Sequence, residues 1–163
     1  MKKCMLLLFF VFCLTGCGAA ETFETVSDEI LQPVMGPVRQ IDLKLPDHAS
    51  VSVMNGTDGG KLYLCDGYTL TVQTLEGGDL DKTIRSLCGF RKEDLTVLQT
   101  ARGPLRCHEW VWTCAGEAGD QLGRAMVLSE GDYHYCLTAM ADAADAASLE
   151  PEWNQLFSSF SLS

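Results

Sequence analysis

Three two-residue turns constrain the fold of this 163-residue chain more than any other feature of its sequence. They are Asp66-Gly67, Arg102-Gly103 and Glu130-Gly131, and each lies between two stretches that we interpret as strands. Short turns that end in glycine join neighbouring antiparallel strands, because glycine accepts the left-handed backbone that such turns require. The sequence therefore predicts three β-hairpins.

The hairpins predict an antiparallel meander of about six strands. In the first hairpin, the turn sets Cys65 opposite Tyr68 and Tyr63 opposite Leu70, so that these side chains share an apolar face. Further short strands precede this hairpin and end at a cluster of turn residues. The expected strand ranges are 38–45, 50–55, 61–65, 68–75, 95–101, 105–114, 121–129 and 132–140.

Two other stretches have the spacing of amphipathic helices. The first follows Asp79, a good N-cap, and ends at Gly89, a good C-terminal residue. Its apolar residues are Leu80, Ile84, Leu87 and Cys88. The second closes the chain, and Pro151 suits its first turn. Its apolar stripe consists of Leu149, Trp153, Leu156, Phe157 and Phe160. We expect an α+β fold in which both helices pack on the sheet.

The order of these elements over residues 38–163 resembles the PsbP/Mog1-type α/β/α sandwich. The His-Tyr strand at 133–140 and the terminal pattern Trp153…Leu156-Phe157-Ser158-Ser159-Phe160 carry the rest of the resemblance. Roles in that family range from photosystem assembly to GTPase binding. The resemblance therefore implies a fold and no particular function.

The amino terminus has the pattern of an export signal. Met1-Lys2-Lys3 is basic, and an uninterrupted apolar run of eleven residues follows from Cys4 to Leu14. A helix that spans a bilayer needs about 20 such residues, whereas signal peptides use about 7–15. The segment Leu14-Thr15-Gly16-Cys17 resembles the lipobox of bacterial lipoproteins. Two alternatives stay open: an ordinary signal peptide that contains a cysteine, and a buried apolar strand.

The lipobox resemblance implies that the Cys17 sulfur carries a diacylglycerol with fatty acids such as palmitate. It also implies cleavage just before Cys17, so that the lipid holds the protein on the outer face of the cell membrane. We divide the chain into a signal peptide (1–16), a lipid-anchored tether and lead-in (17–37) and a single α+β domain (38–163).

The charge of the chain argues against nucleic acid as a partner. The formal charge is −10, and removal of residues 1–16 takes away Lys2 and Lys3 but no acid, which leaves −12. Lys and Arg are scattered singly or in pairs, and so acidic a surface repels phosphate backbones. We expect the mature chain to be a monomer.

Five cysteines remain after residue 17, namely Cys65, Cys88, Cys107, Cys114 and Cys136. Because five is odd, at least one has no partner within the chain, and fifteen patterns of two disulfides are possible. The alternative is that all five are free, buried thiols that behave as small hydrophobic residues, and we favour mostly free thiols. No CxxC pair is present, so a thioredoxin-like role has no support.

The sequence assigns no catalytic, cofactor-binding or metal-binding residue. His108 and Cys114 share a strand face but lie about 20 Å apart, too far to bind one ion. His134 and Cys136 share a face and would need ligands from other strands. Satisfied strand histidines and core cysteines account better for these residues, as caps do for the acids at 79–81 and 93–94 and as core does for Trp110 and Trp112.

Two classes of function remain, with a third behind them. The first is a non-enzymatic, surface-tethered binding or accessory domain for another envelope protein or a small-molecule ligand. The second is a lipid-anchored envelope enzyme whose site no linear motif reveals, which a cleft with several shifted pKa values would favour. The third is a metal-binding lipoprotein. We predict the first.

Overall fold

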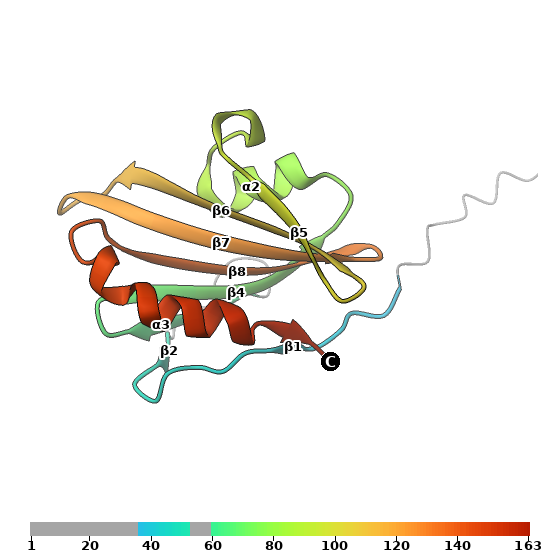
Figure 1. Ribbon diagram of the computed structural model, residues 1–163, viewed down its shortest axis with the longest axis horizontal. Helices are drawn as coiled ribbons and strands as arrows, with labels where there is room; N and C mark the ends of the chain where they lie inside the picture. Colours follow the sequence, from blue (N-terminus) through green and yellow to red (C-terminus); the bar gives the residue numbers. More distant parts are fainter. Residues whose placement is uncertain (1–35, 53–59) are drawn as a thin grey trace, which may run out of the picture. The chain divides into compact units, whose positions relative to one another are not determined.

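The computed structural model describes residues 36–52 and 60–163, and their strands form two antiparallel sheets (Figure 1). The larger sheet has seven strands in the order β2-β3-β4-β8-β7-β6-β5. Its strands are β2 (Ser50–Val51), β3 (Lys61–Cys65), β4 (Tyr68–Glu76), β5 (Leu98–Arg102), β6 (Leu105–Ala115), β7 (Asp120–Glu130) and β8 (Tyr133–Asp142). Within the described residues, the helices are α2 (Leu80–Cys88), the 3-10 turn η2 (Lys92–Asp94) and α3 (Ala146–Ser159).

All three predicted hairpins are present, and their registers follow the turns. In the first, Cys65 pairs with Tyr68 and Tyr63 with Leu70, as expected. The turn glycine there, Gly67, has a φ of 78°, a left-handed conformation that glycine adopts without strain. The sequence pattern therefore determined both the pairing and the face on which each side chain lies.

The two helices cover opposite faces of the large sheet (Figure 1), which makes the α/β/α arrangement expected from the element order. On one face α3 packs through Trp153, Leu156 and Phe157 onto a large apolar core. On the other face Ile84 of α2 packs against Trp110 and Trp112. The α+β prediction is confirmed, as is the interpretation of both tryptophans as core residues.

Helix α2 has the predicted ends. The Asp79 carboxylate accepts a hydrogen bond from the Asp81 backbone N–H at 3.0 Å, which caps the amino end. At the other end Gly89 has a φ of 78° and donates its N–H to the Arg85 carbonyl. The cap interpretation of the acids near this helix is confirmed for Asp79.

The start predicted for the last helix is wrong. Helix α3 begins at Ala146, so that Pro151 lies in its interior and not in its first turn. Ala146 and Ala147 favour helix strongly, and they extend the helix backwards from the apolar stripe. Because Pro151 has no N–H, one interior backbone hydrogen bond is missing.

The strand predicted at 38–45 is also mostly wrong. Only β1 (Ile41–Asp42) forms, and it pairs with β9 (Ser161–Leu162), which the sequence did not predict, in a separate two-stranded sheet. Leu43 and Leu45 pack against the core beneath α3, but their backbone joins no strand. The alternation of apolar side chains in this segment therefore indicated their burial but not the pairing of their backbone in a sheet.

Two further boundaries differ from prediction. Strand β2 is limited to Ser50–Val51, and the remainder of the predicted strand, from residue 53, lies outside the described residues. Strand β5 begins at Leu98 rather than Leu95, because η2 precedes it and Leu95 packs into the core beneath α2.

Within the described residues, no helix is long and apolar enough to cross a membrane.

Candidate binding pocket beside helix α3

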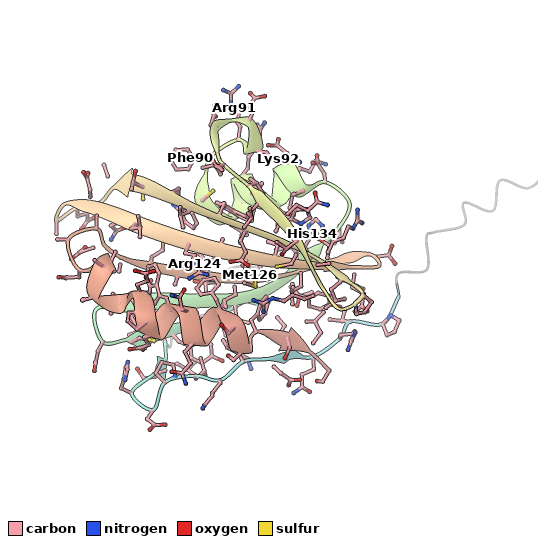
Figure 2. All side chains as sticks on the ribbon, in the orientation of Figure 1. Phe90, Arg91, Lys92, Arg124, Met126 and His134 are labelled. Carbon is pink, nitrogen blue, oxygen red and sulfur yellow. The ribbon has the colours of Figure 1, made fainter. Side chains whose placement is uncertain are left out.

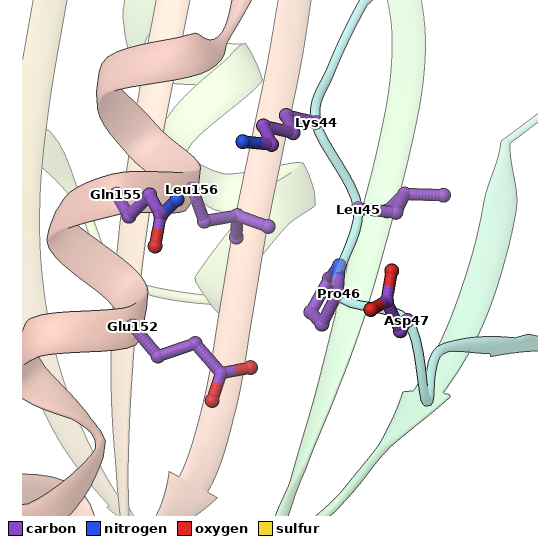
Figure 3. Close-up of a pocket in the computed structure, with 7 residues that line it drawn as sticks. All are labelled: Lys44, Leu45, Pro46, Asp47, Glu152, Gln155 and Leu156. Carbon is purple, nitrogen blue, oxygen red and sulfur yellow. The ribbon is translucent and has the colours of Figure 1, made fainter.

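A pocket of about 250 Å³ lies between α3 and the segment that joins β1 to β2 (Figure 3). This volume is below the range of about 300–1,000 Å³ that is usual for drug-sized ligands, so the pocket suits a small molecule. We call it the α3 pocket. The residues that line it are Lys44, Leu45, Pro46, Asp47, Glu152, Gln155 and Leu156.

Charges of opposite sign stand at two sides of the α3 pocket. Figure 3 shows the Lys44 side chain on one side of Leu156, and the carboxylates of Glu152 and Asp47 on the other. In the described part of the chain, neither the Lys44 ammonium nor the Asp47 carboxylate takes part in an ion pair or side-chain hydrogen bond. Both groups are therefore available to a ligand that enters between them.

Two side chains, Tyr68 and His48, hold the Glu152 carboxylate in place. The buried Tyr68 hydroxyl donates a hydrogen bond of 2.6 Å to Glu152 Oε1, and His48 Nε2 lies 3.5 Å from the same oxygen. Burial, and then this hydrogen bond, raises the pKa of Tyr68 above its ordinary value. Tyr68 therefore stays protonated and acts as a fixed donor that orients Glu152.

Cys65, whose thiol shares a hydrogen bond with Tyr68, is not activated. Burial raises the pKa of the Cys65 thiol, and the negative charges of Glu152 and Asp66 raise it further, against a hydrogen bond with Tyr68 that lowers it. Reactive cysteines have lowered pKa values because a cation or a helix amino end stabilises their thiolate. The surroundings of Cys65 therefore favour an inert thiol.

The two strand histidines lie on the α2 side of the sheet, and Figure 2 labels His134 on β8. His134 Nδ1 shares a hydrogen bond of 2.7 Å with the Thr83 hydroxyl of α2, whereas Nδ1 of His108 is buried with no partner in the described residues. Burial lowers the pKa of both imidazoles, and the nearby charge of Arg106 acts in the same direction. Both histidines are therefore neutral core residues at pH 7.

No metal site joins these histidines to the cysteines. Across residues 36–52 and 60–163, no group of three or more His, Cys, Asp and Glu side chains is arranged to hold an ion. All five cysteines, which lie within the described residues, are free thiols, and Cys107 and Cys136 are fully buried. Burial raises the pKa of both. Cys107 and Cys136 therefore act as hydrophobic residues of the core. That all five thiols are free agrees with the favoured interpretation of mostly free thiols.

The lipobox residues Leu14, Thr15, Gly16 and Cys17 lie outside the described residues, so their role stays a prediction. The residues of the α3 pocket were not predicted from the sequence. They come from two segments at opposite ends of the domain, residues 44–47 and 152–156. The sequence of each segment alone is that of an ordinary solvent-exposed surface. The one available signal was the clustering of Lys44, Asp47 and His48 around Pro46.

Comparison with known proteins supports the fold and goes no further. No family model matches the chain, and no curated protein matches it in sequence. Among solved structures, the solution structure of cyanobacterial PsbP (CyanoP) from Synechocystis sp. PCC 6803 aligns with a TM-score of 0.58 at 11% identity. That alignment covers 76% of this chain and 86% of CyanoP.

Two further structures align over a similar part of the chain. LpqN, described as involved in cell envelope biogenesis of Mycobacterium tuberculosis, has a TM-score of 0.50 at 14% identity, over 77% of this chain and 84% of its own. A protein from Bacteroides thetaiotaomicron has a TM-score of 0.53 at 11% identity, over 76% of this chain but only 45% of its own. At such low identities the likeness extends to the fold alone. The chain has a PsbP-like α+β fold.

Proposed function

We propose that this protein is a lipoprotein anchored through Cys17 on the outer face of the cell membrane, and that its domain is a non-enzymatic binding or accessory module. The lipobox resemblance supports the anchor. The PsbP-like fold, shared with an envelope protein, supports the accessory role without specifying it.

The α3 pocket is the observation that carries the binding role. Its Lys44 ammonium and the Asp47 and Glu152 carboxylates face a small space with apolar walls at Leu156 and Pro46. Such an arrangement matches a small zwitterion of the amino-acid type, whose carboxylate would meet Lys44 and whose ammonium would meet the two acids. An apolar side chain would lie against Leu156.

The same groups argue for binding over catalysis. General acid–base catalysis works best with a group whose pKa lies near the operating pH. Here Tyr68 is held protonated and the Cys65 thiolate is disfavoured, so neither group is poised to transfer a proton or attack a substrate. The Tyr68–Glu152 hydrogen bond fixes a receptor group instead.

Ligand-observed NMR with L-leucine as the probe tests the pocket. We expect weak binding, with a dissociation constant of about 1 mM, by the full chain in mild detergent. N-acetyl-leucine amide, which has the same side chain and no charges, should not bind. Lys44→Gln should abolish the signal, whereas Lys82→Gln, an exposed lysine on α2, should leave it unchanged. Equal signals from leucine and its blocked form would refute the zwitterion site.

Lipid labelling tests the anchor separately. Cells that express the chain and receive radiolabelled palmitate should yield a labelled protein in the membrane fraction. Cys17→Ala should remove both the label and the membrane association. A mutant that is still labelled would show that the lipid is not on Cys17.

A further inference from the structure

The outer edge of β6 is only half covered. Strand β5 pairs with β6 from Leu105 to Glu109, and its first residue, Leu98, pairs with Glu109. Strand β6 continues to Ala115, and over that stretch only β7, on its inner side, pairs with it in the described structure. Figure 1 shows this end of β6 reaching past β5. Along Val111–Ala115, alternate residues therefore point backbone N–H and C=O groups away from the sheet.

An apolar groove adjoins this open edge. It has a volume of about 290 Å³ and lies between β6, β7 and the flank of α3 opposite the α3 pocket. Val111 is 57% exposed at its margin, and Trp153 lines it, 3% exposed and with no hydrogen-bond partner for its indole N–H in the described residues. The groove thus offers an apolar surface beside a row of unused backbone groups.

The chain segments that form the open half of β6 and the groove are acidic. Residues 107–123 and 140–163 contain no Lys or Arg. Arg124, which lines the groove, is already committed to Glu109 at 3.2 Å and Asn154 at 2.7 Å. In these segments the acids that take part in no ion pair within the described residues are Glu117, Asp120, Asp142, Asp145 and Glu150.

We propose that the β6 edge at Val111–Ala115, with the adjoining groove, docks an extended, basic segment of another protein as an added strand. An extended chain is the one ligand whose backbone repeats the spacing of the open edge. Alternate apolar side chains would enter the groove, and lysines or arginines would meet the acids. A second copy of this chain fits poorly, because edge-to-edge pairing would bring two acidic ends together.

This surface lies apart from the α3 pocket, so the proposal goes beyond the zwitterion site and is tested independently of it. The probe is a fluorescent peptide of alternating valine and lysine, about ten residues long, titrated with the full chain in mild detergent. We expect a dissociation constant of about 1–100 μM that rises with salt. The valine–glutamate analogue should bind at least about tenfold more weakly.

Two controls separate strand addition from simple charge attraction. N-methylation of alternate peptide amides removes backbone donors without changing side chains, and the analogue methylated on the pairing edge should lose at least about tenfold in affinity. Val111→Lys should weaken binding by a similar factor. Leu98→Lys, at an equally exposed position on β5, should change it less than about threefold.

Several outcomes would overturn the proposal. They are equal affinity of both possible N-methylated analogues and the parent peptide, no binding of the parent peptide at about 1 mM, and equal effects of the two lysine variants. Sedimentation that shows a stable dimer, abolished by Val111→Lys, would assign the edge to a second copy. The peptide analogues act on the unaltered protein, so a variant that fails to fold does not remove the test.

Discussion

The two faces of the large sheet are built differently, although each carries one helix. Beneath α3 the core is almost wholly apolar, with Tyr135, Leu137, Phe157 and Phe160 fully buried. Beneath α2 the core is smaller and mixes polar groups with apolar ones. Of the five buried side-chain atoms that lack hydrogen-bond partners in the described residues, four lie on this face: His108 Nδ1, Trp110 Nε1, Ser129 Oγ and Thr138 Oγ1.

The two faces should therefore contribute differently to the stability of the fold. An apolar layer beneath a long helix gains free energy in proportion to the area it removes from water. A buried polar atom without a partner costs about 1–3 kcal/mol. The α3 face should therefore dominate stability, and the α2 face should be sensitive to packing errors and to protonation.

The largest effect is expected at Trp153. Its ring is 3% exposed and meets the Tyr68 ring edge-on at 6.0 Å between centroids. Trp153→Ala should cost about 3–5 kcal/mol, a large part of a total stability of roughly 5–15 kcal/mol. Thermal melts followed by circular dichroism measure the loss.

Asn154→Ala is the control for Trp153→Ala. Asn154 is exposed and its side chain accepts one hydrogen bond, from Arg124, so the loss of that side chain should cost less than about 1 kcal/mol. If both variants melted within about a degree of the wild type, α3 would not be docked on the sheet, and the comparison of the two faces would fail.

A smaller effect is expected on the α2 face at Gly123. A methyl group at this position would overlap the Trp112 ring and lie 2.7 Å from Met140 Sδ. Gly123→Ala should therefore cost about 1–3 kcal/mol through overpacking. Adding Trp112→Phe should recover part of that loss, because the smaller ring leaves room for the methyl group. A double variant less stable than the sum of the two single changes would contradict this account.

The smallest effect is expected from pH, and it should come from the α2 face. Burial lowers the pKa values of His108 and His134 below 6.5. As the pH falls below 6.5, these imidazoles are therefore protonated in the unfolded chain before they are protonated in the folded chain. Stability should be full above about pH 6.5 and should fall as the pH decreases below it.

Urea midpoints at about pH 7.5 and about pH 5.5 measure this dependence. The wild type should have the lower midpoint at the acidic pH. Replacing both histidines by asparagine should reduce the difference between the two pH values, whatever its effect on stability at pH 7.5. If the difference is unchanged in the double variant, the histidines are not its source.

Local signals predicted the parts of the fold that depend on local chemistry. The turn glycines gave the hairpin registers, and Asp79 and Gly89 gave both ends of α2. Prediction failed where pairing depends on distant residues. Strand β9 exists because Ser161 meets Asp42 from the other end of the domain, and nothing near either residue signals that contact.

The candidate site was less predictable than the fold. Glu152 follows a proline on an amphipathic helix, and its sequence context is that of a solvated surface residue. Its role comes from Tyr68 and His48, which two other segments bring to it. Such a constellation exists only after the sheet and α3 have packed together.

Arg39 links the amino-terminal end of the domain to the sheet and to the carboxyl end. Its guanidinium donates hydrogen bonds to Glu130 at 2.9 Å and to the backbone carbonyl of Leu162 at 2.9 Å, and its backbone N–H donates to the Tyr135 hydroxyl. Under the proposed anchor at Cys17, a pull on the domain would enter through residues 36–39. Gly36, whose N–H donates to the Asp132 carboxylate at 2.9 Å, and the Arg39 contacts would share that force and pass it to β7, β8 and the carboxyl end. The amino-terminal segment would therefore not peel away alone, because the same contacts hold the sheet and the last residues of the chain.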